Sequence, residues 1–162
     1  MTDRSTTHAT FTLERVYDAP VERVFAAWGD PVAKSRWFAG VKDASSQSPA
    51  MELDFQVGGT ERTVGTPQEG GPVYTYEGWF HDILPHERIV LTNRIQRDSE
   101  LISVNLVSIQ FTAEGAGTRL TVIDHGAYLD GHDRAEWRET GTRDQLDRLE
   151  GELVARPSAG AE

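Results

Sequence analysis

The feature that most constrains the fold is a run of six strand-like segments between residues 51 and 122, one of them rich in threonine and the others with apolar and polar side chains that alternate. The first of them places Met51, Leu53, Phe55 and Val57 at every second position, with polar residues between them. Such alternation indicates strands with one buried face, and the predicted strands are 51–57, 60–66, 74–81, 89–95, 102–111 and 120–122. Short turns join them, so neighbouring strands are expected to pair antiparallel.

One strand and two short helices precede this run, and one long helix follows it. A strand is predicted over 11–18, a helix over 21–28, and a second helix over 31–38 with Asp30 as its N-cap. The last helix is predicted to start at a capping box formed by Asp133 and Glu136. A sheet followed by one long helix must curl around that helix to cover its apolar face. The predicted fold is therefore α+β, a curved antiparallel sheet of about seven strands wrapped on the C-terminal helix.

Length and composition limit the classes of protein that fit. The 162 residues suit one domain, predicted over 10–154 between flexible ends at 1–9 and 155–162. The absence of cysteine excludes a disulfide scaffold, a thiolate metal site and a cysteine nucleophile. The net charge of −10 argues against a general nucleic-acid surface. No apolar run is long enough for a membrane span and the N-terminus does not resemble a signal peptide, so a cytoplasmic protein is expected.

Catalytic and metal-binding motifs are missing from the sequence. The five histidines form no HExxH pattern, and neither the G-x-S-x-G elbow nor a phosphate-binding glycine loop is present. The sequence therefore predicts no metal and no cofactor. Polar residues that interrupt an apolar strand phase are the remaining candidates for a site: Asn93, Arg15, Asp124 and His125. Asp124 and His125 are adjacent, so only one of them is expected to face inward unless the strand bulges.

A series of short motifs in a fixed order resembles the START-like (SRPBCC, polyketide cyclase/lipid-transport) superfamily. The series comprises Tyr17-Asp-Ala-Pro20, Arg36-Trp37-Phe38, Val57-Gly58-Gly59, Glu77-Gly78-Trp79-Phe80, Ile83-Leu84-Pro85-His86-Glu87 and Gly117-Thr118-Arg119-Leu120-Thr121. Within the superfamily the sequence is most similar to the group named after the activator of the heat-shock chaperone ATPase. The resemblance implies a helix-grip fold with a cavity between sheet and helix. It also implies hydrophobic ligands for most members and enzymatic activity for a minority. Where members often carry Trp after the glycine of the last helix, this chain has Thr142.

Three hypotheses for function follow. The first is a non-enzymatic module that binds a hydrophobic or amphipathic small molecule. Its predicted ligand-binding residues, which also suit plain core packing, are Trp37, Phe38, Phe55, Tyr74, Tyr76, Phe80, Asn93, Leu146 and Leu149. The second is a cyclase, hydratase or lyase acting on a polyketide-like or aromatic substrate, with His125, Asp124 or Asn93 as catalytic candidates. The third is an interaction module for a chaperone or for a second copy of the chain, suggested by the acidic composition and by Trp79.

Overall fold

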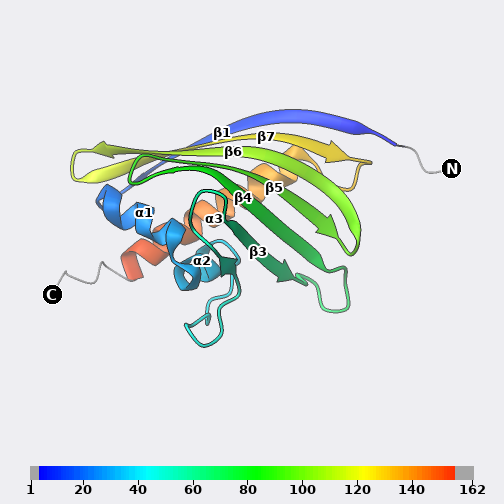
Figure 1. The fold of residues 1–162 in the computed structure, drawn as a ribbon, viewed down its shortest axis with the longest axis horizontal. Helices are drawn as coiled ribbons and strands as arrows, with labels where there is room; N and C mark the ends of the chain where they lie inside the picture. The colour runs from blue at the N-terminus through cyan, green and yellow to red at the C-terminus, as the bar shows by residue number, and fades with distance from the viewer. Residues whose placement is uncertain (1–3, 156–162) are drawn as a thin grey trace.

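The computed structural model describes residues 4–155 and confirms the predicted α+β class. One seven-stranded antiparallel sheet curves around a long C-terminal helix, and two short helices lie beside that helix (Figure 1). The strand order across the sheet is β1-β7-β6-β5-β4-β3-β2. The elements are β1 (Thr6–Tyr17), α1 (Val21–Gly29), α2 (Pro31–Trp37), β2 (Glu52–Leu53), β3 (Thr60–Gly65), β4 (Tyr74–Leu84), β5 (Arg88–Arg97), β6 (Glu100–Glu114), β7 (Gly117–Leu129) and α3 (Ala135–Ala155).

The predicted strand at 51–57 is mostly wrong, because β2 contains only two residues. After Leu53 the backbone folds into tight turns: Gln56 N donates to Asp54 O and Gly59 N donates to Gln56 O. A Cβ atom at Gly59 would lie 2.1 Å from Asp54 O, so the turn requires glycine there. Val57 is consequently exposed rather than buried. The alternation of side chains continued past the point where the strand ends.

The sheet extends further than the apolar pattern indicated. Strand β1 begins at Thr6, not at residue 11, and its residues 6–9 pair with residues 126–129 of β7. The predicted flexible N-terminus at 1–9 is therefore wrong for residues 6–9, whose polar side chains gave no apolar signal. Residues 1–3 and 156–162, which include most of the predicted flexible tail, lie outside the described residues.

One predicted helix cap is confirmed and the other is wrong. Asp30 Oδ1 accepts from Val32 N at 2.9 Å and from Ala33 N at 3.3 Å, as an N-cap does. Asp133 lies too early for the same role, because α3 begins at Ala135. Its carboxylate instead accepts from Arg134 N at 2.8 Å and from the Arg138 guanidinium at 2.9 Å.

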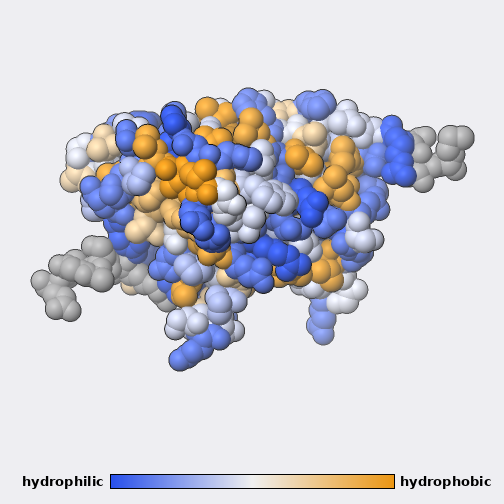
Figure 2. Space-filling model, viewed as in Figure 1, coloured by the Kyte–Doolittle hydropathy of each residue, from blue (hydrophilic) through white to orange (hydrophobic). Residues whose placement is uncertain are grey.

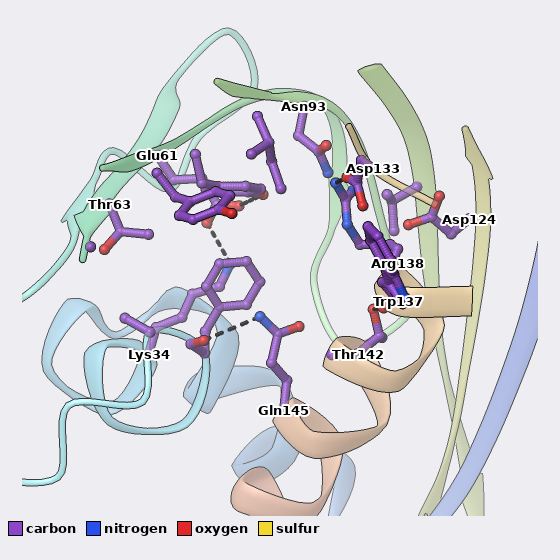
Figure 3. Close-up of a pocket in the computed structure, with 18 of the residues that line it drawn as sticks. Lys34, Glu61, Thr63, Asn93, Asp124, Asp133, Trp137, Arg138, Thr142 and Gln145 are labelled. Carbon is purple, nitrogen blue, oxygen red and sulfur yellow. Dashed lines mark hydrogen bonds and ion pairs between the residues drawn. The ribbon is translucent and has the colours of Figure 1, made fainter. Parts of the chain in front are cut away.

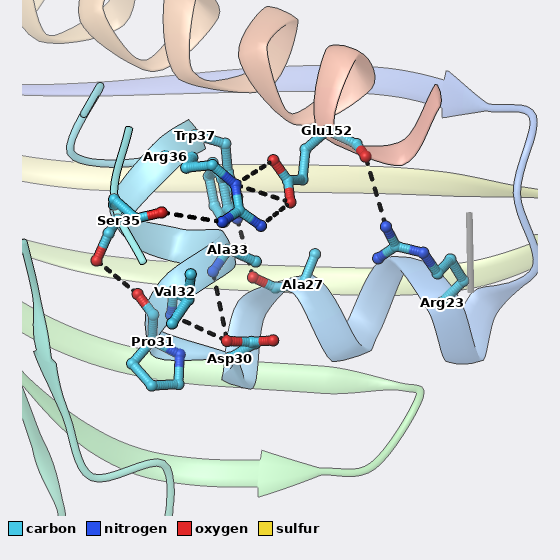
Figure 4. Close-up of polar contacts among 11 residues, drawn as sticks. Arg23, Ala27, Asp30, Pro31, Val32, Ala33, Ser35, Arg36, Trp37 and Glu152 are labelled. Atoms are coloured by element: carbon cyan, nitrogen blue, oxygen red, sulfur yellow. Dashed lines mark hydrogen bonds and ion pairs between the residues drawn. The ribbon is translucent and has the colours of Figure 1, made fainter. Parts of the chain in front are cut away.

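The C-terminal half of α3 is docked firmly against the rest of the molecule. Leu146, Leu149 and Leu153 are buried in the core, and the Tyr17 hydroxyl donates to Leu146 O at 2.9 Å. Close by, the Arg36 guanidinium of α2 binds both carboxylate oxygens of Glu152 (Figure 4). The N-terminal half of α3 has no fully buried residue, so it leaves space between itself and the sheet.

The surface mixes hydrophobic and hydrophilic residues. Figure 2 shows hydrophobic patches over the strands, each interrupted by hydrophilic side chains, and hydrophilic tips on the two projecting loops that Figure 1 places before β2 and after β3. Trp79 lies half-buried on the convex face of the sheet, with the Arg94 guanidinium 5.4 Å from its ring centroid. No helix within residues 4–155 is long and apolar enough to cross a membrane.

Candidate functional site

A cavity of about 780 Å³ lies between the concave face of the sheet and the N-terminal half of α3 (Figure 3). Its volume is within the roughly 300–1,000 Å³ range of small-molecule sites. The walls are mainly apolar, and the apolar and aromatic residues that line it include Trp37, Phe38, Tyr74, Leu91, Ile95, Ile102, Val107, Ile109, Val122 and Leu146. The ligand-sized space thus lies beside the N-terminal half of α3, which has no buried residue.

The structure divides the residues predicted from sequence into two groups. Trp37, Phe38, Tyr74, Tyr76, Asn93 and Leu146 line the cavity. Phe55, Phe80 and Leu149 do not line it; they pack in the core, where the Phe55 and Phe80 ring centroids are 5.3 Å apart and Leu149 is fully buried. The alternation of apolar residues along a strand shows which side chains face the concave side of the sheet. It cannot show which of them line the cavity and which pack in the core, because both lie on that side.

A buried ion pair that the sequence analysis missed forms one end of the cavity. Lys34 Nζ lies 2.5 Å from Glu61 Oε1, and each side chain is only 1% exposed. The Tyr76 hydroxyl donates to Glu61 Oε2 at 2.6 Å. The rings of Trp28, Phe38 and Phe80 surround the ammonium group, with centroids 5.1 to 5.7 Å from Nζ. A signal existed in the sequence: Lys34 precedes Trp37 and Phe38 by three and four residues, which is the spacing of one helix face.

A row of five residues crosses the concave face, one on each of five neighbouring strands. The strand register aligns Glu61, Gly78, Asn93, Asn105 and Gly126, so polar side chains alternate with glycines along part of the row. A Cβ atom at Gly78 would lie 3.0 Å from Glu61 Cγ, and one at Gly126 would lie 2.7 Å from Asn105 Nδ2. The two glycines therefore provide the space into which the polar side chains extend.

Asn93 and Glu61 are the polar residues of this row that line the cavity, and Asn93 is the uncharged one. It is 6% exposed, and its amide points into the cavity in Figure 3. Its Oδ1 atom has no hydrogen-bond partner among residues 4–155. Burial, and next the charge of Glu61, raise the pKa of Tyr76 well above its ordinary value, while a side-chain hydrogen bond from Asn93 acts in the opposite direction. Tyr76 is thus a neutral phenol held between Glu61 and Asn93.

Asp124 and His125 point to opposite faces of β7, as expected for neighbours in a strand. Asp124 lines the cavity and is 4% exposed, whereas His125 is exposed on the convex face, where its Nδ1 lies 2.7 Å from Thr10 Oγ1. Asn105 Nδ2 donates to Asp124 Oδ1 at 2.5 Å and to the Tyr128 hydroxyl at 3.2 Å. Burial raises the pKa of Asp124 although the Asn105 hydrogen bond and Arg138 act against that rise. Of these two alternative candidates, Asp124 lines the cavity and His125 does not.

The charged residues at the α3 end of the cavity are arranged in pairs. Arg138 donates to Asp133 at 2.9 Å and to Ser103 Oγ at 2.6 Å, and His132 Nε2 lies 2.6 Å from Glu100. Arg15 and Arg94 do not line the cavity; they pair with Asp147 of α3 and Glu77 of β4 at 3.2 and 3.1 Å. Within the described part of the chain, no cluster of three or more His, Asp or Glu residues has a geometry that could hold a metal ion.

Comparison with known proteins places this architecture in a family. The family model described as "Activator of Hsp90 ATPase homolog 1-like protein" matches residues 18–153. A structure of an uncharacterized protein from Rhizobium leguminosarum is 36% identical, with a TM-score of 0.85 over 95% of this chain and 99% of that one. The Mll3558 protein from Rhizobium loti is 38% identical, with a TM-score of 0.82 over 92% and 99%.

More distant structures share the fold alone. An AHSA1-like protein from Aeromonas hydrophila is 21% identical, with a TM-score of 0.65 over 95% of this chain and 96% of that one. A comparison with curated proteins gave no match. The resemblance found in the sequence is thereby confirmed, and the chain belongs to the family of proteins similar to the activator of Hsp90 ATPase homolog 1, the AHSA1-like family.

Proposed function

We propose that this protein binds a small hydrophobic or amphipathic molecule in the cavity between the sheet and α3. The observation that carries the proposal is the cavity itself, of about 780 Å³ with mainly apolar walls. At about 24 cal/mol per Å³, a dry void of that size would cost roughly 19 kcal/mol. That cost exceeds the ~5–15 kcal/mol by which a domain is stable. The space therefore holds water or a ligand, and apolar walls favour a ligand.

The substitution Thr142→Trp tests this proposal by filling the cavity. Thr142 lines the cavity, and its hydroxyl bonds only the Arg138 carbonyl of its own helix, at 2.9 Å. The probe is N-phenyl-1-naphthylamine, a neutral dye whose fluorescence rises in apolar surroundings. The wild-type protein is expected to bind it saturably and to melt at a higher temperature in its presence. Thr142→Trp is expected to weaken binding at least 10-fold, because the indole occupies the space that the dye needs.

Thr140→Trp is the matched control. Thr140 lies on the same helix and makes the same hydrogen bond, to Glu136 O at 2.9 Å, but its side chain is exposed and does not line the cavity. It should bind the dye as the wild type does. If the wild type binds no dye, or if the two tryptophan variants bind it equally, the cavity is not the binding site.

An enzyme remains the second candidate, and one observation favours it. Asp124 is a buried carboxyl group on the cavity wall whose pKa is raised by that burial, as is common for catalytic acids and bases. With Asn93 it would serve a cyclase, hydratase or lyase acting on an aromatic or polyketide-like substrate. Turnover that survives Asp124→Asn would remove this candidate. Chaperone binding is a third candidate, suggested by the acidic composition, by Trp79 and by the family to which the chain belongs. Stimulation of an Hsp90 ATPase would test it.

A further inference from the structure

We infer that the ligand of this cavity is an uncharged molecule with a hydrogen-bond donor, such as a phenolic or alcoholic O–H, directed at Asn93 Oδ1. The inference rests on the proposed binding function and adds the chemical class of the ligand. It stands on two observations: the fixed orientation of the Asn93 amide, and the pairing of the charged groups along the cavity wall.

The orientation of the Asn93 amide follows from a chain of hydrogen bonds that starts at Glu61. Lys34 donates to Glu61 Oε1 and the Tyr76 hydroxyl donates to Glu61 Oε2. Since the Tyr76 proton is used toward Glu61, the phenol oxygen can only accept from its other neighbour. A side-chain hydrogen bond of Asn93 acts to lower the pKa of Tyr76, and only the amide nitrogen of Asn93 can donate to the phenol oxygen. The carbonyl oxygen of Asn93 is then left without a donor among the described residues.

A buried carbonyl oxygen without a donor is unusual, because the large majority of buried polar atoms in proteins have a partner. Asn93 is more than nine-tenths buried, and its amide is aimed into the cavity (Figure 3). Because Asn93 lines the cavity, we assign the missing donor to the contents of the cavity. A ligand that carries an O–H or N–H group supplies it, whereas an ether or ketone oxygen at the same place would oppose it.

Most of the charged groups that line the cavity are paired, and the exception is Asp124, which accepts from Asn105 and whose pKa is raised by burial. Lys34 pairs with Glu61 at one end and Arg138 pairs with Asp133 at the other. The Arg97 guanidinium lies 3.0 Å from His132 Nδ1, and His132 in turn contacts Glu100. An anionic ligand would have to enter a mostly apolar space without an uncommitted cation, which is costly. A cationic ligand would meet only the Asp124 carboxyl group, whose burial favours its neutral form. An uncharged ligand meets no such cost.

Three biphenyls of nearly equal size test the inference on the wild-type protein. In 4-hydroxybiphenyl the substituent donates a hydrogen bond, in 4-methoxybiphenyl it only accepts, and in 4-methylbiphenyl it does neither. Isothermal titration calorimetry at pH 7 is expected to show that the hydroxyl compound binds about 2- to 12-fold more tightly than the other two. This is the range expected for one net hydrogen bond between neutral groups.

Asn93→Leu assigns the effect to one residue. Leucine keeps the shape of the side chain and removes the acceptor, so all three biphenyls should bind this variant with similar affinity. Thr92→Val is the matched control. Thr92 directly precedes Asn93 in β5, and its hydroxyl lies 2.8 Å from His81 Nε2 on the convex face. It should retain the preference for the hydroxyl compound. If Asn93→Leu does not fold, Asn93→Ala replaces it, and the wild-type comparison is decisive in any case.

The outcomes separate this inference from the proposed function. Equal binding of the three biphenyls to the wild type would overturn the donor requirement, for example because a bound water satisfies Asn93, and would leave the binding function intact. A preference that persists in both Asn93 variants would overturn the role of Asn93. Failure of all three compounds to bind would overturn the proposed function together with the inference.

Discussion

At the scale of single residues, the Lys34–Glu61 pair is the most consequential polar contact in the molecule. Both side chains are 1% exposed, and removing a lysine and a glutamate from water costs several kcal/mol per ion. The structure offsets this cost with three aromatic rings around Lys34 and with the Tyr76 hydroxyl on Glu61. The pair therefore orders Tyr76, and through Tyr76 it orients Asn93.

Breaking this pair should be strongly destabilising. Lys34→Met leaves the Glu61 carboxylate buried without its cation, and we expect a loss of about 3–5 kcal/mol in the free energy of unfolding. Adding Glu61→Gln should restore a large part of that loss, because a neutral amide still accepts from Tyr76. Urea denaturation of the wild type, both single variants and the double variant measures the coupling. Losses that simply add would show that the two groups do not depend on each other.

At the scale of the elements, glycines in two strands determine where polar side chains fit. Gly126 of β7 stands opposite Asn105 of β6, and the space above it is occupied by the Asn105 amide and the Tyr128 hydroxyl. Glycine in a strand interior usually weakens the strand and marks a close approach. At Gly126 the groups that come close are the side chains of Asn105 and Tyr128 from the same sheet. The space above the glycine lets the Asn105 amide lie against Asp124.

Gly126→Ala should therefore destabilise the sheet by about 1–3 kcal/mol, the usual cost of overpacking. The added Cβ atom would lie 2.6 Å from Tyr128 Oη and 2.7 Å from Asn105 Nδ2, so both side chains must move. Gly65→Ala in β3 is the control, because nothing lies within 4 Å of a Cβ atom there, and its effect should stay within about 0.5 kcal/mol. Thermal or urea unfolding compares the two. Equal effects would mean that the row across the sheet tolerates a larger residue.

Sequence reasoning predicted the elements with a strong period and failed where backbone turns or polar residues decided. The order of strands and helices and the Asp30 cap could be read from alternation and helical spacing. The end of β2 could not, because the Asp54–Gly59 turn interrupts a continuing apolar pattern. In the cavity, Asn93 and Asp124 were found because they interrupt apolar strand phases. Glu61 was missed because its strand is mostly polar. A polar residue at a buried position therefore did not interrupt any apolar pattern.

At the scale of the whole molecule, the core and the cavity share part of their walls. The core is concentrated where α1, α2 and the C-terminal half of α3 meet the sheet, and it includes Val24, Phe25, Phe111 and Leu120. Toward the N-terminal half of α3 it gives way to the cavity, whose walls carry buried polar groups. One of these groups, Asp124, titrates with a raised pKa, so it should make the stability of the whole protein depend on pH.

Asp124→Asn should change that dependence in a defined direction. Burial raises the pKa of Asp124 above the ordinary value of 3.8, so above about pH 4 the folded state holds this proton more tightly than the unfolded state. As pH rises through the folded pKa, the wild type loses stability that it does not regain at higher pH. The variant has no such proton and can still accept from Asn105. Its stability relative to the wild type should therefore increase from pH 4 upward and then level off.

Asp130→Asn provides a control of opposite sign. Hydrogen bonds from the Ser5 backbone and from Arg4 lower the pKa of Asp130, so its carboxylate contributes stability that is complete above the unfolded pKa and is lost only in more acidic solution. Its variant should differ from the wild type by a constant amount at every pH well above the ordinary carboxyl pKa, whereas the Asp124 difference grows as pH rises from about 4. Urea midpoints measured at half-unit pH steps from 4 to 8 distinguish the two. A stability difference for Asp124→Asn that is constant over this whole range would show that Asp124 is ionised in the fold as easily as in the unfolded chain, and that the cavity wall at β7 is hydrated.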